Sequence, residues 1–174
     1  MPRPIETTTA YTNAAVKLRR MVSLSPAFQR ECGVSSDVEA LQRIHLRGRQ
    51  IRDKAPTPFA LIQVGNLRRG MYAGGVKNWL KASGSLRASI KLNVADDLLD
   101  DLIGAELYAS NFFGTVFDEV AKMAAEDDPG SGDEFGHLAI TQMELEFDIN
   151  DDKLWVTEGI YHFAFLHVMW EGGS

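Results

Sequence analysis

The run from Gly159 to Trp170 constrains the fold more than any other part of the sequence. Nearly every position in it is apolar, so an extended chain here would present two apolar faces. An antiparallel strand with one face in water alternates between apolar and polar residues, whereas a doubly apolar strand needs cover on both sides. We therefore expect helices to cover one face of this strand and a neighbouring subunit to cover part of the other.

A strand with one polar face is predicted at 86–94, where apolar residues occupy every even position from Leu86 to Val94. The residues between them are Arg87, Ser89, Lys91 and Asn93. Similar but shorter patterns predict strands at 43–46, 58–64 and 143–149.

Helices are predicted before the first of these strands and between the later ones in the sequence. The Thr7–Thr9 run offers a cap for a first helix, and Ser25, Pro26 and Gly33 are typical of the start and end of a second. Ser36 and Glu39 form a capping-box pattern for a third. An apolar stripe predicts a long helix over 103–125. We expect one domain over 1–174, of the α+β class, with a mostly antiparallel sheet and helices packed largely on one face.

The segment 65–84 is too long for a tight turn and combines five glycines with large apolar residues. We predict a protruding glycine-rich arm that contacts a partner, because large apolar groups on a protruding segment usually mark a contact surface. The candidate contact residues are Met71, Tyr72, Trp79 and Leu80.

Charge is divided unevenly along the chain. Residues 1–95 hold sixteen of the eighteen Lys and Arg with five acids, a net charge of +11, while 96–174 hold two Lys and nineteen acids, a net −17. Three interpretations stay open: the charges average out over one domain, the basic half binds nucleic acid, or copies assemble head to tail. For the third, the candidate interface residues in the basic half are Arg47, Arg49 and Arg52.

The sequence offers no recognisable catalytic motif. The four histidines lack the spacing of a metal site, and Cys32 has no partner thiol. The acidic residues of 127–134 lack the spacing of a calcium loop. We therefore expect no enzyme activity, no cofactor and no metal.

Nothing in the sequence predicts a membrane protein or a secreted one. No apolar run approaches the roughly 20 residues that a membrane-spanning helix needs, and Met1–Glu6 does not resemble a signal peptide. With a single cysteine as well, we expect synthesis in a reducing cytoplasm and no membrane partner.

Taken in order, several segments resemble a tailed-bacteriophage neck protein of the tail terminator type. The resemblance covers roughly residues 10–170, and the helix containing Asn111-Phe112-Phe113-Gly114 contributes most to it. The other segments are Ser25–Gln29 after a leading helix, 43–46, 58–62, 86–94 and the closing strand that ends at Trp170.

This resemblance implies a hexameric ring in the neck of the virion, made in the host cytoplasm. The ring would cap the tail tube, end tube polymerisation and present the surface to which the head connector docks. Its partners would be further copies of itself, the tail-tube protein and the head connector, stopper or adaptor protein. Genome DNA would pass through the lumen without specific binding, and no active site is implied.

Three alternatives remain. A tail-completion or head–tail adaptor protein occupies the adjoining ring of the neck. A small nucleic-acid-binding protein would use the basic half, although no motif of stacking aromatic residues accompanies its basic stretch. A metal-dependent hydrolase has only scattered acids in its favour.

Overall fold

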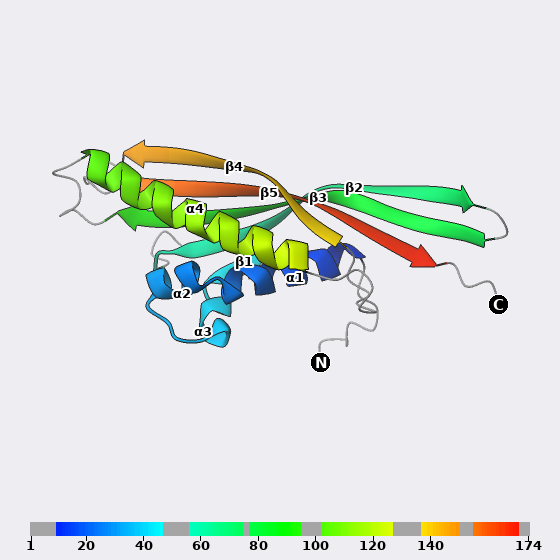
Figure 1. Ribbon diagram of the computed structural model, residues 1–174, viewed down its shortest axis with the longest axis horizontal. Helices are drawn as coiled ribbons and strands as arrows, with labels where there is room; N and C mark the ends of the chain where they lie inside the picture. Colours follow the sequence, from blue (N-terminus) through cyan, green and yellow to red (C-terminus); the bar gives the residue numbers. More distant parts are fainter. Residues whose placement is uncertain are drawn as a thin grey trace.

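The structure is a computed structural model that describes residues 10–46, 56–74, 77–94, 102–126, 137–149 and 155–170. Within these ranges it has four helices and five strands (Figure 1). In chain order they are α1 (Ala10–Leu24), α2 (Pro26–Cys32), α3 (Asp37–Leu41), β1 (Ile44–Leu46), β2 (Phe59–Gly74), β3 (Lys77–Val94), α4 (Leu102–Glu126), β4 (His137–Ile149) and β5 (Trp155–Trp170).

The strands form one sheet in the order β1-β2-β3-β5-β4. β1 runs parallel to β2, and the other neighbouring pairs are antiparallel. The predicted α+β class with a mostly antiparallel sheet is therefore confirmed. In the chain, α4 connects β3 to β4, and β5 then returns to pair with both of these strands.

The helix α2 begins and ends, and the helix α3 begins, where the sequence predicts. The Ser25 side chain accepts a hydrogen bond from the Phe28 amide at 3.2 Å, with Pro26 at the first helical position of α2. Gly33 ends α2 at φ 67°, in the left-handed region that favours glycine. Ser36 caps α3 by accepting from the Glu39 amide at 3.3 Å. Local capping chemistry therefore fixes these boundaries.

Strand register divides the sheet into two faces. In β3 and β5, Leu86 lies opposite Phe163 and Ala88 lies opposite Tyr161, and all four residues are buried. We call this the inner face, because its residues share one core with buried residues of all four helices, Leu18 of α1 among them. The core therefore lies between the inner face and the helices.

The outer face carries the alternate residues of the same strands. Arg87 lies opposite His162, and Lys91 lies opposite Glu158. Ser89, between these two rows, is buried and donates a hydrogen bond to the Glu158 carboxylate. The alternation predicted at 86–94 thus separates an apolar face from a polar one.

α4 meets the inner face at a close contact between Phe113 and Gly159. A Cβ atom on Gly159 would lie 2.2 Å from Cδ1 of Phe113, so no larger residue fits beneath this ring. The Tyr161 hydroxyl donates to the Phe113 carbonyl at 2.8 Å, and burial raises the pKa of that hydroxyl. The hydroxyl therefore stays protonated and holds α4 at this position on β5.

Glu119 joins α4 to the start of α2. Its Oε2 atom accepts from the Ser25 hydroxyl at 2.6 Å and from the Ala27 amide at 3.1 Å. A carboxylate that accepts from amides at a helix N-terminus is favourably placed, because those groups lack partners within the helix. The residue that caps α2 is therefore itself held by α4.

Among the described residues, three strands continue the sheet beyond the helices. We call residues 69–74 of β2, 77–82 of β3 and 167–170 of β5 the extension; in Figure 1 it projects to the right, beyond α1 and α4. β2 reaches it through a register shift between Val64 and Leu67, where the Asn66 amide donates to the Ser85 hydroxyl at 3.1 Å. Residues 65–74 and 77–84 thus lie in the paired strands β2 and β3, with β5 as a third strand.

Two glycines give a paired test of the α4 contact. Gly159→Ala should lower the free energy of unfolding by about 1–3 kcal/mol, because the new methyl group overpacks against Phe113. Gly114→Ala lies in α4 with no atom within 4 Å of its Cβ, and should raise that free energy by about 0.5–1 kcal/mol. Urea unfolding measures both, and a neutral Gly159→Ala would contradict the contact.

A second pair tests the link at Glu119. Glu119→Ala leaves Ser25 Oγ and the Ala27 amide without their partner, so we expect a loss of about 1.5–3 kcal/mol in unfolding free energy. The control is Glu126→Ala, also on α4, where an exposed carboxylate lies 3.9 Å from Lys122. The control should leave the urea midpoint unchanged. Equal midpoints for the two variants would exclude a structural role for the Glu119 bonds.

Candidate functional site

The candidate contact residues of the sequence fall into two groups. Arg47, Arg49 and Arg52 lie outside the described residues. The other four lie on the extension, in neighbouring rows of the sheet, and their role as a contact surface stays a prediction. The two rows pair Met71 with Leu80 and Tyr72 with Trp79.

β5 adds two residues to these rows that sequence reasoning did not single out as contact residues. Trp170 lies opposite Trp79, and Met169 lies opposite Leu80. In the backbone register, Tyr72, Trp79 and Trp170 therefore occupy one row across the three strands. The only signal in the sequence was the doubly apolar character of the last strand, which does not specify the strand it pairs with.

The strand order turns the charge division of the sequence into a division in space. The strands β1, β2 and β3 contain six Lys and Arg residues and no acid, whereas β4 and β5 contain four acids and no Lys or Arg. Because the order is β1-β2-β3-β5-β4, one side of the sheet is basic and the other acidic. The basic residues are Arg68, Arg69, Lys77, Lys81, Arg87 and Lys91, and the acidic ones are Glu144, Glu146, Asp148 and Glu158.

The two longest helices, α1 and α4, follow the same division. α1 carries Lys17, Arg19 and Arg20 and contacts β1 and β2, whereas α4 carries four acids and one lysine and contacts β4. Exposed Glu106 lies in the first half of α4, and exposed Glu144 and Glu146 lie in the second half of β4. We call these three carboxylates the acidic end. In Figure 1 the first half of α4 and the second half of β4 both lie at the left, opposite the extension.

The outer face holds a polar cluster around His162. Its Nε2 atom lies 3.6 Å from Oε2 of Glu144, and Gln142 donates to Oε1 of the same carboxylate at 2.6 Å. Nε of Arg87, opposite His162, is buried without a hydrogen-bond partner within the described residues. Within those residues no three His, Cys, Asp or Glu side chains are grouped to hold a metal ion. The cluster therefore combines groups of both charge signs on the outer face, and no metal-binding group is found there within the described residues.

Cys32 is half-buried at the end of α2, and its thiol lies 3.8 Å from the Pro58 carbonyl. Burial raises the pKa of Cys32 to about 11; the Arg43 charge opposes this shift and the Glu31 charge adds to it. A neutral thiol is a poor nucleophile. The residue therefore does not suit covalent catalysis.

No protein-family model and no curated protein matches this chain. Among the described helices, none combines the length and the apolar character that crossing a membrane requires.

The protonation state of the Cys32 thiol is tested by its reactivity. At pH 8 a pKa of about 11 leaves about one thiol in a thousand ionised, against about a quarter for an ordinary cysteine. We therefore expect the folded protein to react with Ellman's reagent at least about tenfold more slowly than the urea-unfolded chain. Equal rates would show that the thiol is reactive in the native state.

Proposed function

We propose that this chain is a structural protein of a tailed-phage virion that forms a ring, six copies in the tail terminator reading, at the end of the tail tube. The ring ends tube polymerisation and joins the tail to the head connector, and genome DNA passes through its lumen. The resemblance in the sequence suggests this function. The observation that carries it is the spatial division of charge across the sheet.

A head-to-tail contact uses this division directly. When identical copies meet through two different surfaces, the contact repeats around a ring or along a filament. A basic side and an acidic side on one chain attract each other between copies, whereas like sides repel. Charge therefore favours contacts that bring the basic side of one copy to the acidic side of another, as a head-to-tail contact does.

Open strand edges support the same contact. β1 pairs with β2 only at residues 60–62, and β4 pairs with β5 no further than Leu166. Within the described residues, the outer stretches of β2 and β5 thus have one unpaired edge each, on opposite sides of the extension. Unpaired edges offer backbone groups to a neighbouring chain.

Two alternatives share part of this support. A head–tail adaptor or tail-completion protein also assembles as a ring, and it would bind the connector rather than the tail tube. A nucleic-acid-binding protein is favoured by the six basic residues of β2 and β3, but the acidic half of the chain opposes binding to a polyanion.

The ring is tested by sedimentation of the purified protein, alone and with the tail-tube protein of the phage that encodes it. We expect an oligomer whose population falls as salt rises, because exposed charges are screened beyond about 8 Å at physiological ionic strength. Glu146→Lys should weaken assembly further. Glu126→Lys is the control, because it makes the same change in charge at the C-terminal end of α4, away from Glu146 on β4, and it should weaken assembly less.

A salt-independent monomer, even with tube protein present, would contradict the proposal. Assembly only in the presence of connector protein would favour the adaptor. Retardation of duplex DNA at moderate salt, with affinity falling by about 0.9 log units per phosphate contact for each log unit of salt, would favour the nucleic-acid alternative.

A further inference from the structure

The exposed side of α1 carries apolar and basic residues together. Val16, Arg20 and Leu24 follow one another at intervals of four, so they lie on one face of the helix, about a turn apart. Val16 is 50% exposed, Leu24 is 40% exposed, and Arg20 is exposed between them. The opposite side of the helix is buried in the core through Ala14 and Leu18. We call Val16, Arg20 and Leu24 the α1 stripe.

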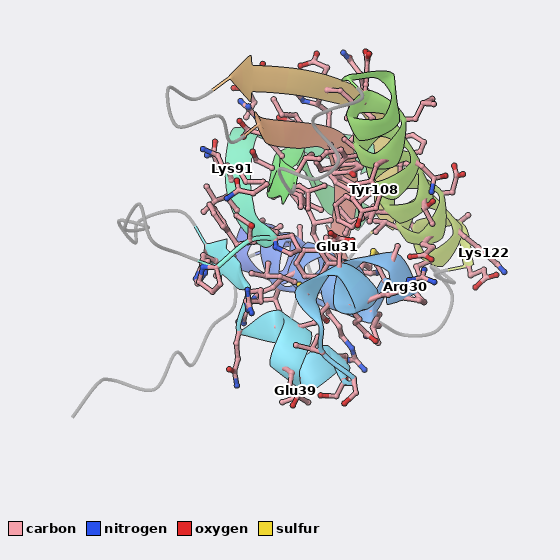
Figure 2. All side chains as sticks on the ribbon, turned by 90° about the vertical axis from the view of Figure 1, so that its left-hand side faces the viewer. Arg30, Glu31, Glu39, Lys91, Tyr108 and Lys122 are labelled. Carbon is pink, nitrogen blue, oxygen red and sulfur yellow. The ribbon has the colours of Figure 1, made fainter. Side chains whose placement is uncertain are left out.

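Apolar groups lie beside carboxylates on the first half of α4. Leu107 is 64% exposed and Tyr108 is 40% exposed, and the side chain of Glu106, next to them in the sequence, is exposed as well. The Tyr108 hydroxyl donates to Oε2 of Glu31 on α2 at 2.5 Å, and Figure 2 shows these two side chains together. We call Glu31, Glu106, Leu107 and Tyr108 the Tyr108 patch.

The bond to Glu31 restrains the Tyr108 ring within the folded chain. Burial, this hydrogen bond and the charge of Glu31 raise the pKa of Tyr108 to about 12. The hydroxyl therefore stays protonated and remains a donor to Glu31 across the physiological pH range. Because the ring is already restrained, a partner that packs on it costs less side-chain entropy on binding.

These two surfaces hold most of the large apolar groups that the described part of the chain leaves exposed. Of six such side chains, two lie on the α1 stripe and two on the Tyr108 patch, and the others are Val38 on α3 and Leu46 on β1. A single exposed apolar residue is ordinary on a protein surface. On α1 and α4 these residues instead lie in pairs beside charges of one sign, as at the centre and rim of an interface.

The two surfaces do not cover each other within one copy. α1 and α4 direct their buried sides into the core that they share, with Leu18 from α1 and Phe113 from α4. Val16 and Leu107 meanwhile stay at least half exposed in the folded chain. A contact that covers both surfaces is therefore a contact between two copies. Because the two surfaces differ, such a contact repeats from one copy to the next.

We propose that the α1 stripe of one copy docks on the Tyr108 patch of the next copy. Arg20 then meets the carboxylate of Glu106, and the apolar groups of the stripe cover Leu107. The inference rests on the proposed self-assembly and names the two surfaces that meet in it.

Charge complementarity identifies a second copy as the partner. α1 carries three basic residues and no acid, whereas α4 carries four acids and one lysine. Within the described residues, the side chains of Arg20 and Glu106 form no ion pair, so both charges are available to a neighbour. Nucleic acid or an anionic membrane would be attracted by the α1 stripe alone and repelled by the Tyr108 patch.

The experiment measures the protein concentration at the midpoint of assembly, by sedimentation at low salt. Leu107→Ala and Val16→Ala should each raise this midpoint about tenfold, because each removes an apolar group from one side of the contact. The matched control is Val38→Ala on α3, because Val38 is also 64% exposed and lies outside both surfaces. It should change the midpoint by less than about threefold.

Folding of these variants is measured separately by thermal unfolding. Alanine has a higher helix propensity than valine or leucine, and neither Val16 nor Leu107 belongs to the buried core. Both variants should therefore keep the wild-type unfolding temperature. A change in the assembly midpoint then reports the contact between copies.

A charge exchange tests the pairing of Arg20 with Glu106. Arg20→Glu and Glu106→Arg should each weaken assembly several-fold, and the double variant should restore the midpoint to within about threefold of the wild type. Lys122→Glu is the control, because it makes the same change in net charge as Arg20→Glu at an exposed site in the second half of α4. Additive losses in the double variant would overturn the pairing.

The outcomes separate the contact from the ring. Wild-type assembly in both Val16→Ala and Leu107→Ala would overturn the docking contact, while the ring of the proposed function would remain. A wild-type protein that stays monomeric at every salt concentration, alone and with tail-tube protein, would overturn both.

A different partner for the α1 stripe would also be seen directly. A fluorescent DNA duplex and vesicles containing phosphatidylserine serve as probes. Binding to either probe that Arg20→Glu abolishes, with self-assembly unchanged, would overturn the proposal in favour of a nucleic-acid or membrane surface.

Discussion

The contact between Phe113 and Gly159 determines how the rest of the molecule is arranged. The ring of Phe113 occupies the space that a side chain at position 159 would need, and the Tyr161 hydroxyl bonds to the Phe113 carbonyl from the next inner-face position along β5. α4 is thereby fixed against the middle of the sheet. Through Glu119 it also fixes the start of α2, so that two elements distant in the sequence share one support.

The same arrangement separates the charges. The chain leaves β3 through α4, continues into β4 beyond the place of β5, and returns as β5 between the two strands. The late, acidic part of the sequence is thus added to one side of the sheet, whereas the early, basic part forms the other. An order that placed β4 beside β2 would have mixed the two signs. The strand order therefore keeps the basic strands apart from the acidic ones within the sheet.

Sequence reasoning succeeded where a local interaction decides the structure. The caps at Ser25, Gly33 and Ser36 are short-range hydrogen bonds or a single backbone angle, and a local pattern contains all the information needed. The buried stripe of α4 was also recognised, because its period of 3.6 residues is unbroken along the helix.

Reasoning from the sequence was incomplete where a register shift interrupts a pattern. β4 begins at His137, six residues before its predicted start, because the shift between Ile140 and Gln142 changes which positions face the core. Leu138 and Ile140 lie opposite the inner-face residues of β5 on one side of the shift, and Met143 does so on the other. A test for strict alternation detects only one of these phases. The shift in β2 after Val64 interrupts the pattern in the same way, within the segment 65–84 that the sequence predicts as a protruding glycine-rich arm.

The prediction of the candidate site from the sequence was incomplete for a further reason. Trp79 and Trp170 are neighbours only through the pairing of β3 with β5, and the register along the whole of these strands sets that pairing. Gly159 lies opposite Ile90, and the close approach of Phe113 leaves no room for another residue there. A shift by one residue would place a side chain under that ring and turn the inner face of β5 outward. The contact that positions α4 therefore also fixes the aromatic row of the extension, more than ten residues further along β3.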